Sequence, residues 1–294
     1  MYVKCGMLPK ARKVLEELSF RDVVSWNALI AGYAEWEQGH EALNCFEEMQ
    51  SEGISPNVVT FICILQCCAS VRAIDKGRRI HEEVMNRGLL EKDIALGNAL
   101  VHMYSKCGLL AKAKEVLEQL PMRTTVTWNA LITGYAQQGQ SLEALKCFEW
   151  MQSEGIYPDA ITFTCILKVC GSIGSLDKGK IIHDQILNRS LLVKDIMLGT
   201  ALVDMYAKCG ILTRAQEVLE ELPVRNAVSW NALISGYAEK GKCNNAFTCI
   251  KSMQKDGLTP NVVTFICILK ACGSAGALDQ GSKIHEEIMR AGLL

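Results

Sequence analysis

The sequence lacks the short motifs that mark common catalytic sites. It contains no C-x-x-C, no G-x-x-x-x-G-K-[ST] and no G-x-S-x-G, and no paired carboxylates indicate a cleft. No apolar run comes near the ~18–20 residues that a membrane-spanning helix needs. The apolar and polar residues do not alternate as they do in strands. We therefore expect no enzyme, no membrane partner and no β-sheet in this chain.

The chain also lacks an excess of charge of either sign. Its 31 basic and 32 acidic residues give a net charge of −1, which argues against strong non-specific binding of polyanions. Any nucleic-acid surface would therefore be local. Hydrophobic residues make up 49% of the chain, too many for a disordered polymer. The first ten residues, MYVKCGMLPK, are typical neither of a signal peptide nor of a transit peptide, and they resemble the middle of a repeat. We expect a piece of a longer protein.

Cysteine and histidine are present but are not spaced as metal ligands. The 14 cysteines recur at fixed places inside apolar patterns, as in the KCG strings at Cys5, Cys107 and Cys209. We expect them to be reduced, buried side chains of a protein from a reducing compartment. The string HEE at His81 fits the H-x-E of zinc nucleobase deaminases, but that site also requires P-C-x-x-C. No metal and no cofactor are expected, and the recurring histidines are interpreted as structural.

Internal repetition is the dominant feature of the sequence. SWNALI at Ser25 returns as TWNALI at Thr127 and as SWNALI at Ser229, each 102 residues after the last. Each cycle of 102 contains three related repeats of 35, 36 and 31 residues. The expected repeats are 1–22 (partial), 23–57, 58–93, 94–124, 125–159, 160–195, 196–226, 227–261 and 262–294 (partial). The whole chain is therefore expected to be a single array.

Each repeat is predicted to form two helices. In repeat 23–57, apolar residues recur at i, i+3, i+4 and i+7 from Trp26, which predicts a helix with Ser25 as its N-cap. A second amphipathic stretch follows at 41–53, and Pro56 prevents its continuation. One helix pair cannot bury both its faces, so neighbouring pairs must stack. The expected fold is all-α, an α-solenoid of stacked helix-turn-helix hairpins that form a right-handed superhelix. The recurring aromatic residues are assigned to its core: Trp26, Trp128, Trp230, Tyr104 and Tyr206.

Two places in each repeat carry polar residues that packing does not explain. The fifth residue of successive complete repeats is Asn27, Ile62, Asn98, Asn129, Thr164, Thr200 and Asn231. The last residue of successive repeats is Asp22, Asn57, Asp93, Thr124, Asp159, Asp195, Asn226 and Asn261. In a stacked array both places lie at one edge, beside an aliphatic second residue: Val24, Val126, Met197 and Val228.

These polar positions allow two interpretations. In the first, the side chains make hydrogen bonds within the scaffold. In the second, they form a surface that reads a ligand. A fixed scaffold bond predicts an unchanging residue, whereas the last residue alternates between Asp and Asn, which exchanges an acceptor for a donor. The alternation favours the reading surface.

The same residues give the sequence a specific resemblance that extends over essentially the whole chain. VVSWNALIAGYA with EALNCFEEMQSEGISPN, VVTFICILQCCAS with KGRRIHEEV, and IALGNALVHMYSKCG with KAKEVLEQLP are similar to P, L and S repeats respectively. The chain thus resembles a pentatricopeptide repeat protein of plant organelles, of the PLS class. The resemblance implies binding of single-stranded RNA at one nucleotide per repeat, read by the fifth and last residues, with the second residue packing against bases.

The resemblance also implies base preferences. Asp in the last place suits uracil N3 or guanine N1, Asn suits cytosine N3 or adenine N1, and Asn or Thr in the fifth place goes with pyrimidines or purines. Asn27 with Asn57 should then prefer C, Asn129 with Asp159 U, Thr200 with Asn226 A, and Asn231 with Asn261 C. Asn98 with Thr124 should read a pyrimidine weakly, Thr164 with Asp195 G, and Ile62 and Ile266 little. Asp22 would read with the incomplete repeat. The expected core, written 5′ to 3′, is Y-n-Y-U-(G)-A-C.

Further expectations follow from the resemblance. Lys106 and Lys208 occupy a place near the phosphate contacts of the family, although a solvated helix end explains them equally well. The L repeats, with Ile62, are candidates for binding small organellar editing cofactor proteins. A mitochondrial or chloroplast location is implied, with C-to-U editing as an activity of the longer protein. The alternative function is a protein-binding or peptide-binding α-solenoid scaffold.

Overall fold

The computed structural model describes residues 1–193, 195–290 and 292 of the chain. All regular structure in these residues is helical, and no strand occurs among them. They divide into two compact units, Met1–Tyr157 and Pro158–Leu294, which we call the N-terminal and C-terminal units. The end of the expected repeat 262–294, residues 293 and 294, lies outside the described part.

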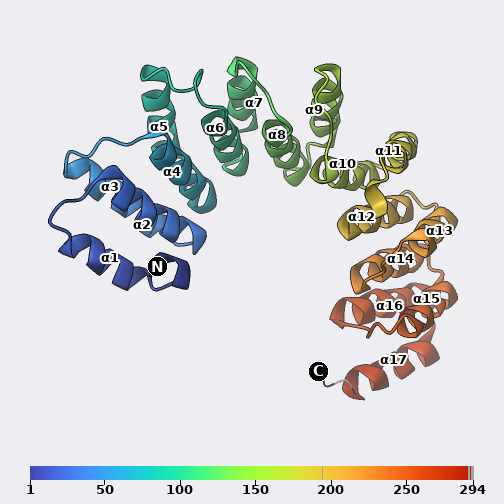
Figure 1. Cartoon of the computed structure of the whole chain (residues 1–294). Helices are drawn as coiled ribbons and strands as arrows, with labels where there is room; N and C mark the ends of the chain where they lie inside the picture. The colour runs from blue at the N-terminus through green and yellow to red at the C-terminus, as the bar shows by residue number, and fades with distance from the viewer. Residues whose placement is uncertain (194, 291, 293–294) are drawn as a thin grey trace. The chain divides into compact units, whose positions relative to one another are not determined.

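Each repeat from 23–57 onward contributes a first and a second helix, and the partial repeat 1–22 contributes a second helix (Figure 1). The first helices are α2 (Val23–Glu35), α4 (Val58–Val71), α6 (Ile94–Lys106), α8 (Thr125–Gln137), α10 (Ala160–Ile173), α12 (Ile196–Lys208), α14 (Ala227–Glu239) and α16 (Val262–Ala275). The second helices are α1 (Leu8–Glu17), α3 (Gly39–Ser51), α5 (Ile74–Asn86), α7 (Leu110–Gln119), α9 (Ser141–Ser153), α11 (Leu176–Asn188), α13 (Leu212–Glu221), α15 (Cys243–Lys255) and α17 (Leu278–Arg290). Two short 3-10 helices, η1 (Val3–Cys5) and η2 (Leu191–Val193), complete the described regular structure.

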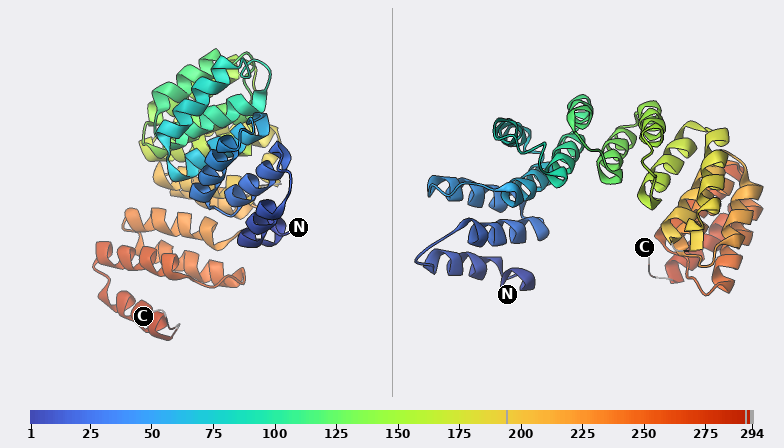
Figure 2. Two further views of the ribbon diagram at one scale, coloured as in Figure 1. Left: turned by 90° about the vertical axis from the view of Figure 1, so that its left-hand side faces the viewer. Right: turned by 45° about the horizontal axis from the view of Figure 1, so that its top comes forward.

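The hairpins of each unit stack through their first helices. In the N-terminal unit α2, α4, α6 and α8 pack in succession, and α3, α7 and α9 each pack on the first helix of their own hairpin. The C-terminal unit repeats this arrangement with α10, α12, α14 and α16, and Figure 2 shows α14 to α17 in orange and red as successive layers. The predicted all-α fold of stacked hairpins is confirmed.

The recurring aromatic residues lie in the cores of the units, as the sequence predicts. Trp26, Trp128 and Trp230 are each at most 5% exposed. The core histidines join the second helix of one repeat to the first helix of the next, since His81 Nδ1 lies 3.0 Å from Tyr104 Oη. His183 and Tyr206 repeat this contact in the C-terminal unit. Burial lowers the pKa of both histidines.

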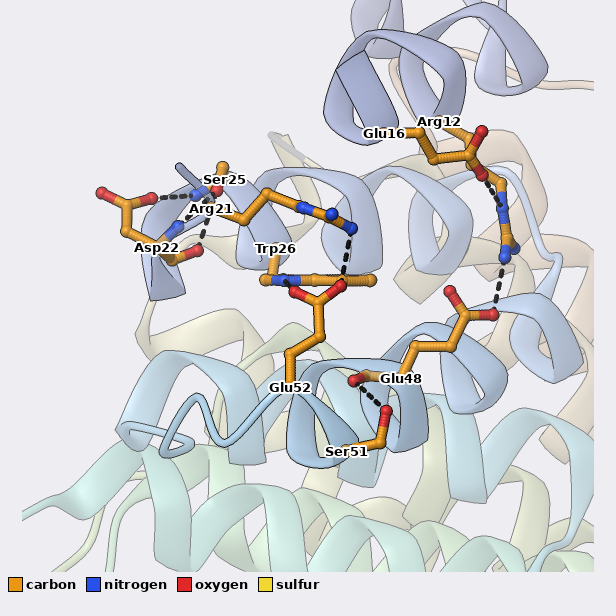
Figure 3. A network of polar contacts seen from close by, with 9 residues as sticks. All are labelled: Arg12, Glu16, Arg21, Asp22, Ser25, Trp26, Glu48, Ser51 and Glu52. Atoms are coloured by element: carbon orange, nitrogen blue, oxygen red, sulfur yellow. Dashed lines mark hydrogen bonds and ion pairs between the residues drawn. The ribbon is translucent and has the colours of Figure 1, made fainter. Parts of the chain in front are cut away.

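A polar network ties the start of a hairpin to its end (Figure 3). Arg21 precedes α2 and pairs with Glu52, just after α3, at 2.6 Å. The indole Nε1 of Trp26 donates to the other oxygen of Glu52. In the C-terminal unit Arg225 pairs with Asp256 Oδ2 at 3.2 Å, and the Trp230 indole donates to the same oxygen at 3.1 Å. These contacts hold the N-terminal end of the first helix in place. The polar positions lie at or near this end.

Cysteine forms no disulfide bridge in the structure. All 14 cysteines are free thiols. Burial raises the pKa of Cys68 and of Cys147 to about 12, which disfavours the thiolate form that binds metals. The described residues contain no group of three or more potential ligands that could hold a metal ion. Nor does any described helix have the length and apolar character that crossing a bilayer requires.

Candidate nucleic-acid interface

The last residue of each expected repeat is the N-cap of the next first helix. Its side chain accepts a hydrogen bond from the backbone N–H three residues later, for example from Thr60 to Asn57 Oδ1 at 3.0 Å. The same role belongs to Asp22, Asp93, Thr124, Asp159, Asp195, Asn226 and Asn261. The prediction that Ser25 caps the first helix is wrong. Asp22 is the cap because its backbone is extended, with φ −117° and ψ 174°, whereas Ser25 lies inside the helix.

At most junctions between repeats, a hydroxyl side chain three residues after the cap completes a capping box. Ser25 and Thr60 each accept a hydrogen bond from the backbone N–H of the cap, which makes a reciprocal capping box. Thr127, Thr162, Ser229 and Thr264 do the same. At the two junctions that follow complete L repeats the residue is a buried leucine, Leu96 or Leu198. The sequence alone shows that these two junctions carry Leu where the others carry Ser or Thr, a signal that our prediction missed.

The cap employs only one of the two terminal atoms of an Asn side chain. Every side-chain hydrogen bond of Asn57 is made by Oδ1, which accepts from Asn27 Nδ2 and from the Thr60 backbone and lies 3.1 Å from the Thr60 hydroxyl, whose shorter contact is to Asn27. Asn57 is exposed, and its Nδ2 has no hydrogen-bond partner within the described residues. Asn226 and Asn261 likewise use Oδ1. An Asp in this place would supply the same oxygen, so a scaffold bond does tolerate the Asp and Asn alternation, contrary to our argument from the sequence.

The fifth residue lies beside the cap when it is Asn. Asn27 is 8% exposed and donates from Nδ2 to Asn57 Oδ1 at 3.0 Å. Its own Oδ1 accepts from the Thr60 hydroxyl at 2.7 Å. Asn231 and Asn261 repeat the pair in the C-terminal unit at 3.3 Å. The structure therefore brings together, within each unit, the two places that the sequence paired.

The pair Asn98 and Thr124 differs because both hydroxyl groups at this junction donate to the side-chain oxygen of Asn98. Thr124 donates to Asn98 Oδ1 at 3.2 Å, and Thr127 donates to the same oxygen at 2.5 Å. A threonine cap has one hydroxyl and no second polar atom to offer a ligand. The geometry thus gives a physical reason for the weak reading expected of this pair.

A threonine in the fifth place turns back to its own helix. Thr200 is 7% exposed and donates its hydroxyl proton to the Ile196 carbonyl at 3.0 Å, so the oxygen can only accept from a ligand. The Ser229 hydroxyl donates to the main-chain oxygen of Asn226 instead of contacting Thr200. Asn27 therefore keeps an N–H donor on Nδ2, whereas Thr200 keeps only an oxygen acceptor.

The remaining predicted positions lie on first helices or at a helix cap. Thr164 and Ile62 are half-buried on α10 and α4, and Ile266 is 48% exposed on α16. Asn129 is half-buried on α8 of the N-terminal unit, whereas Asp159 belongs to the C-terminal unit and caps α10.

An exposed, large aliphatic residue stands beside most sets of polar positions. The four predicted residues are 58–68% exposed: Val24, Val126, Met197 and Val228. The sequence interpretation missed the equivalent residues of the L repeats, Val59, Ile161 and Val263, which are 53–62% exposed. Their place in the repeat alone would have identified them. Large aliphatic side chains that remain in water at a fixed place suit contact with the faces of unstacked bases.

The two lysines assigned to phosphate differ in their surroundings. Lys106 is exposed at the end of α6. Lys208 is exposed as well, but its Nζ pairs with Asp204 Oδ2 at 2.8 Å within α12. Surface pairs of this kind are weak, so Lys208 can exchange this partner for a phosphate at low cost.

Sequence profiles decide the family. The profile of the PPR repeat family matches residues 21–70, 123–172 and 225–274, and that of the PPR repeat matches residues 98–123. The matched segments make up more than half of the chain. The chain belongs to the PPR repeat family. Within its described residues, this PPR chain consists of helical repeats and shows no catalytic domain.

Curated relatives and solved structures agree with this assignment. A pentatricopeptide repeat-containing protein of Arabidopsis thaliana, named as chloroplastic, is 36% identical over 96% of this chain. Another, named as mitochondrial, is 37% identical over 99% of it. The chain spans only 35% and 42% of the lengths of these two relatives. The crystal structure of the pentatricopeptide repeat protein PPR10 with an 18-nt psaJ RNA element covers 96% of the chain at 21% identity, with a TM-score of 0.77. This likeness, which spans 43% of that PPR10 chain, shows the shared fold.

Proposed function

We propose that this PPR array binds single-stranded RNA with sequence specificity, at about one nucleotide per repeat. The observation that carries the proposal is the division of labour within the cap residue. Oδ1 of Asn57 serves the scaffold, while the residue is exposed and its Nδ2 is unpartnered within the described residues. Family membership and the RNA complex of PPR10 support the same function.

The base preferences follow from the atom that each cap presents. Asn57, Asn226 and Asn261 offer an N–H donor, which suits the N3 acceptor of cytosine or the N1 acceptor of adenine. An Asp cap offers an oxygen acceptor, which suits uracil N3–H or guanine N1–H. The core Y-n-Y-U-(G)-A-C remains our proposal, with U assigned to Asn129 and Asp159.

We also propose a setting for the longer protein. The relatives named as chloroplastic and mitochondrial support a location in one of these organelles. The alternation of P, L and S repeats over 1–294 supports a PLS-class specificity module for C-to-U editing. Exposed apolar residues of the L repeats, such as Ile266, are the proposed surface for small editing cofactor proteins.

A gel-shift experiment tests the binding function. The probe is the heptanucleotide CACUGAC, written from its 5′ end, and the matched control is a scrambled RNA of equal composition. The proposal requires tighter binding of the ordered probe. Equal or absent binding of both RNAs would leave the protein-binding scaffold as the better function.

The substitution Asn57→Asp tests the reading atom. It exchanges the exposed donor for an acceptor and keeps the cap oxygen, so the preferred first base should change from C to U. One hydrogen bond is worth about 0.5–1.5 kcal/mol, so the ratio of the two dissociation constants should shift by roughly two- to tenfold in each direction. Asn261→Asp is the matched variant in the C-terminal unit and should change only the seventh base. An unaltered preference at the first base would refute the assignment.

A further inference from the structure

We propose that the hydroxyl three residues after the cap is a third determinant of base selection, because it fixes the amide of the fifth residue in the preceding repeat. Thr60 acts on Asn27 in the N-terminal unit, and Thr264 acts on Asn231 in the C-terminal unit. Both are positioning residues, since neither is exposed to a ligand. The inference rests on the proposed RNA binding.

The geometry at Thr60 leaves one arrangement for the Asn27 amide. The Thr60 Oγ1 accepts from the backbone N–H of Asn57 at 3.1 Å and donates to Asn27 Oδ1 at 2.7 Å. Asn27 Nδ2 in turn donates to Asn57 Oδ1 at 3.0 Å. Rotating the amide by half a turn would place the Asn27 oxygen against the Asn57 oxygen, an acceptor against an acceptor. Thr60 is fully buried, so water cannot replace its hydroxyl.

The arrangement recurs in the second compact unit. Thr264 Oγ1 donates to Asn231 Oδ1 at 2.7 Å, and Asn231 Nδ2 donates to Asn261 Oδ1 at 3.3 Å. At a third junction, Thr127 donates to Asn98 Oδ1. In both units the Thr hydroxyl donates to an Asn oxygen 33 residues earlier in the chain. This hydrogen bond is therefore a regular feature of the repeat.

The hydroxyl contact is present beside Asn27, Asn98 and Asn231, and it is absent beside Thr200 and Ile62. Where the fifth residue is Thr200, the Ser229 hydroxyl bonds to the main chain of the cap. Where the fifth residue is Ile62, the corresponding place holds Leu96. The capping box alone needs the hydroxyl at Ser229 as much as at Thr60, so capping does not explain the contact with Asn27.

The contact has a chemical consequence for reading. With its oxygen held by Thr60, Asn27 spends one Nδ2 hydrogen on Asn57 and retains one for a carbonyl acceptor on a base. Without the hydroxyl, only the Asn57 oxygen opposes rotation of the amide, so the rotated form, whose oxygen accepts from base N–H groups, becomes more populated. Selection at that base is then relaxed while the exposed Asn57 Nδ2 is unchanged.

Thr60→Val tests the inference. Affinities for CACUGAC and for its variants with U, A or G in the first position give the discrimination at that base. We expect the discrimination to fall at least threefold, and the discrimination at the seventh base, read by Asn231 and Asn261, to remain. Thr60→Ser should retain the wild-type ratios, and Thr264→Val should relax the seventh base alone.

Ser229→Ala is the matched control. It removes a hydroxyl from a capping box that makes no contact with the fifth residue, so thermal stability should fall while discrimination at the sixth base stays. If the wild-type chain binds RNA selectively and Thr60→Val leaves the first-base discrimination unchanged, the inference is wrong and the proposed function stands. If the wild-type chain binds no RNA, both are wrong.

Discussion

At the scale of single residues, the scaffold uses only one of the two terminal atoms of an Asn cap side chain. Asn57 caps α4 through Oδ1, and its Nδ2 has no hydrogen-bond partner within the described residues. An Asp in place of Asn would therefore keep the helix cap, and under the proposed function it would change the base preference of the repeat. Asp22, in the same place, has its pKa lowered by the backbone N–H of Ser25 and is therefore charged at neutral pH.

The stability of cap variants should follow the cap oxygen. Asn57→Ala removes Oδ1 and should lower the free energy of unfolding by about 1 kcal/mol. Asn57→Asp retains the oxygen and adds a negative charge at a helix N-terminus, which is neutral or favourable, so stability should be unchanged or slightly higher. Urea unfolding followed by circular dichroism measures both. A loss for Asn57→Asp as large as for Asn57→Ala would show that Oδ1 is not the stabilising atom.

At the scale of helices, residues near the end of a second helix fix the start of its hairpin. In P repeats the contact is an ion pair, as between Arg21 and Glu52. In the first L repeat Arg87 donates to the Pro56 carbonyl at 2.9 Å and lies over the Phe61 ring, 5.3 Å from its centroid. An acidic residue in P repeats and an arginine in the first L repeat thus occupy the same place after the second helix. Each contacts a residue next to the helix cap.

Arg87→Lys should weaken this contact although the charge is kept. An ammonium group cannot donate to Pro56 and stack on Phe61 as the planar guanidinium does, so a loss of about 1 kcal/mol is expected. Arg79→Lys, on the exposed face of the same α5, is the control and should have little effect. Equal melting temperatures for Arg87→Lys and the wild type would contradict the role of Arg87.

At the scale of the whole molecule, buried titratable groups set a pH window for stability. Burial lowers the pKa of His81, His102 and His183, so the folded chain resists their protonation. Burial raises the pKa of the buried thiols, to about 12 for Cys249 and about 11 for Cys170, so the folded chain resists their ionisation. Both effects weaken the folded state outside the neutral range.

The melting temperature should be highest between about pH 6.5 and 8.5. Below this window the unfolded chain binds more protons through its histidines, and above it the unfolded chain releases more protons from its thiols. Thermal melts in buffers of constant ionic strength measure both limbs. His183→Gln should flatten the acid limb and leave the alkaline limb in place. A melting temperature that rises steadily through pH 9.5 would disprove the role of the thiols.

The sequence by itself determined the helices, the repeat lengths, the aromatic core and the two polar places, because these depend on spacing along the chain. The tertiary structure decided which atom of each polar residue is occupied. Asp22 and Ser25 are both good caps by residue type, and only the backbone angles distinguish them. Thr60 and Asn27 lie 33 residues apart, so their hydrogen bond exists only because stacking brings two hairpins together. A local pattern cannot encode such a contact, since its geometry depends on packing between repeats.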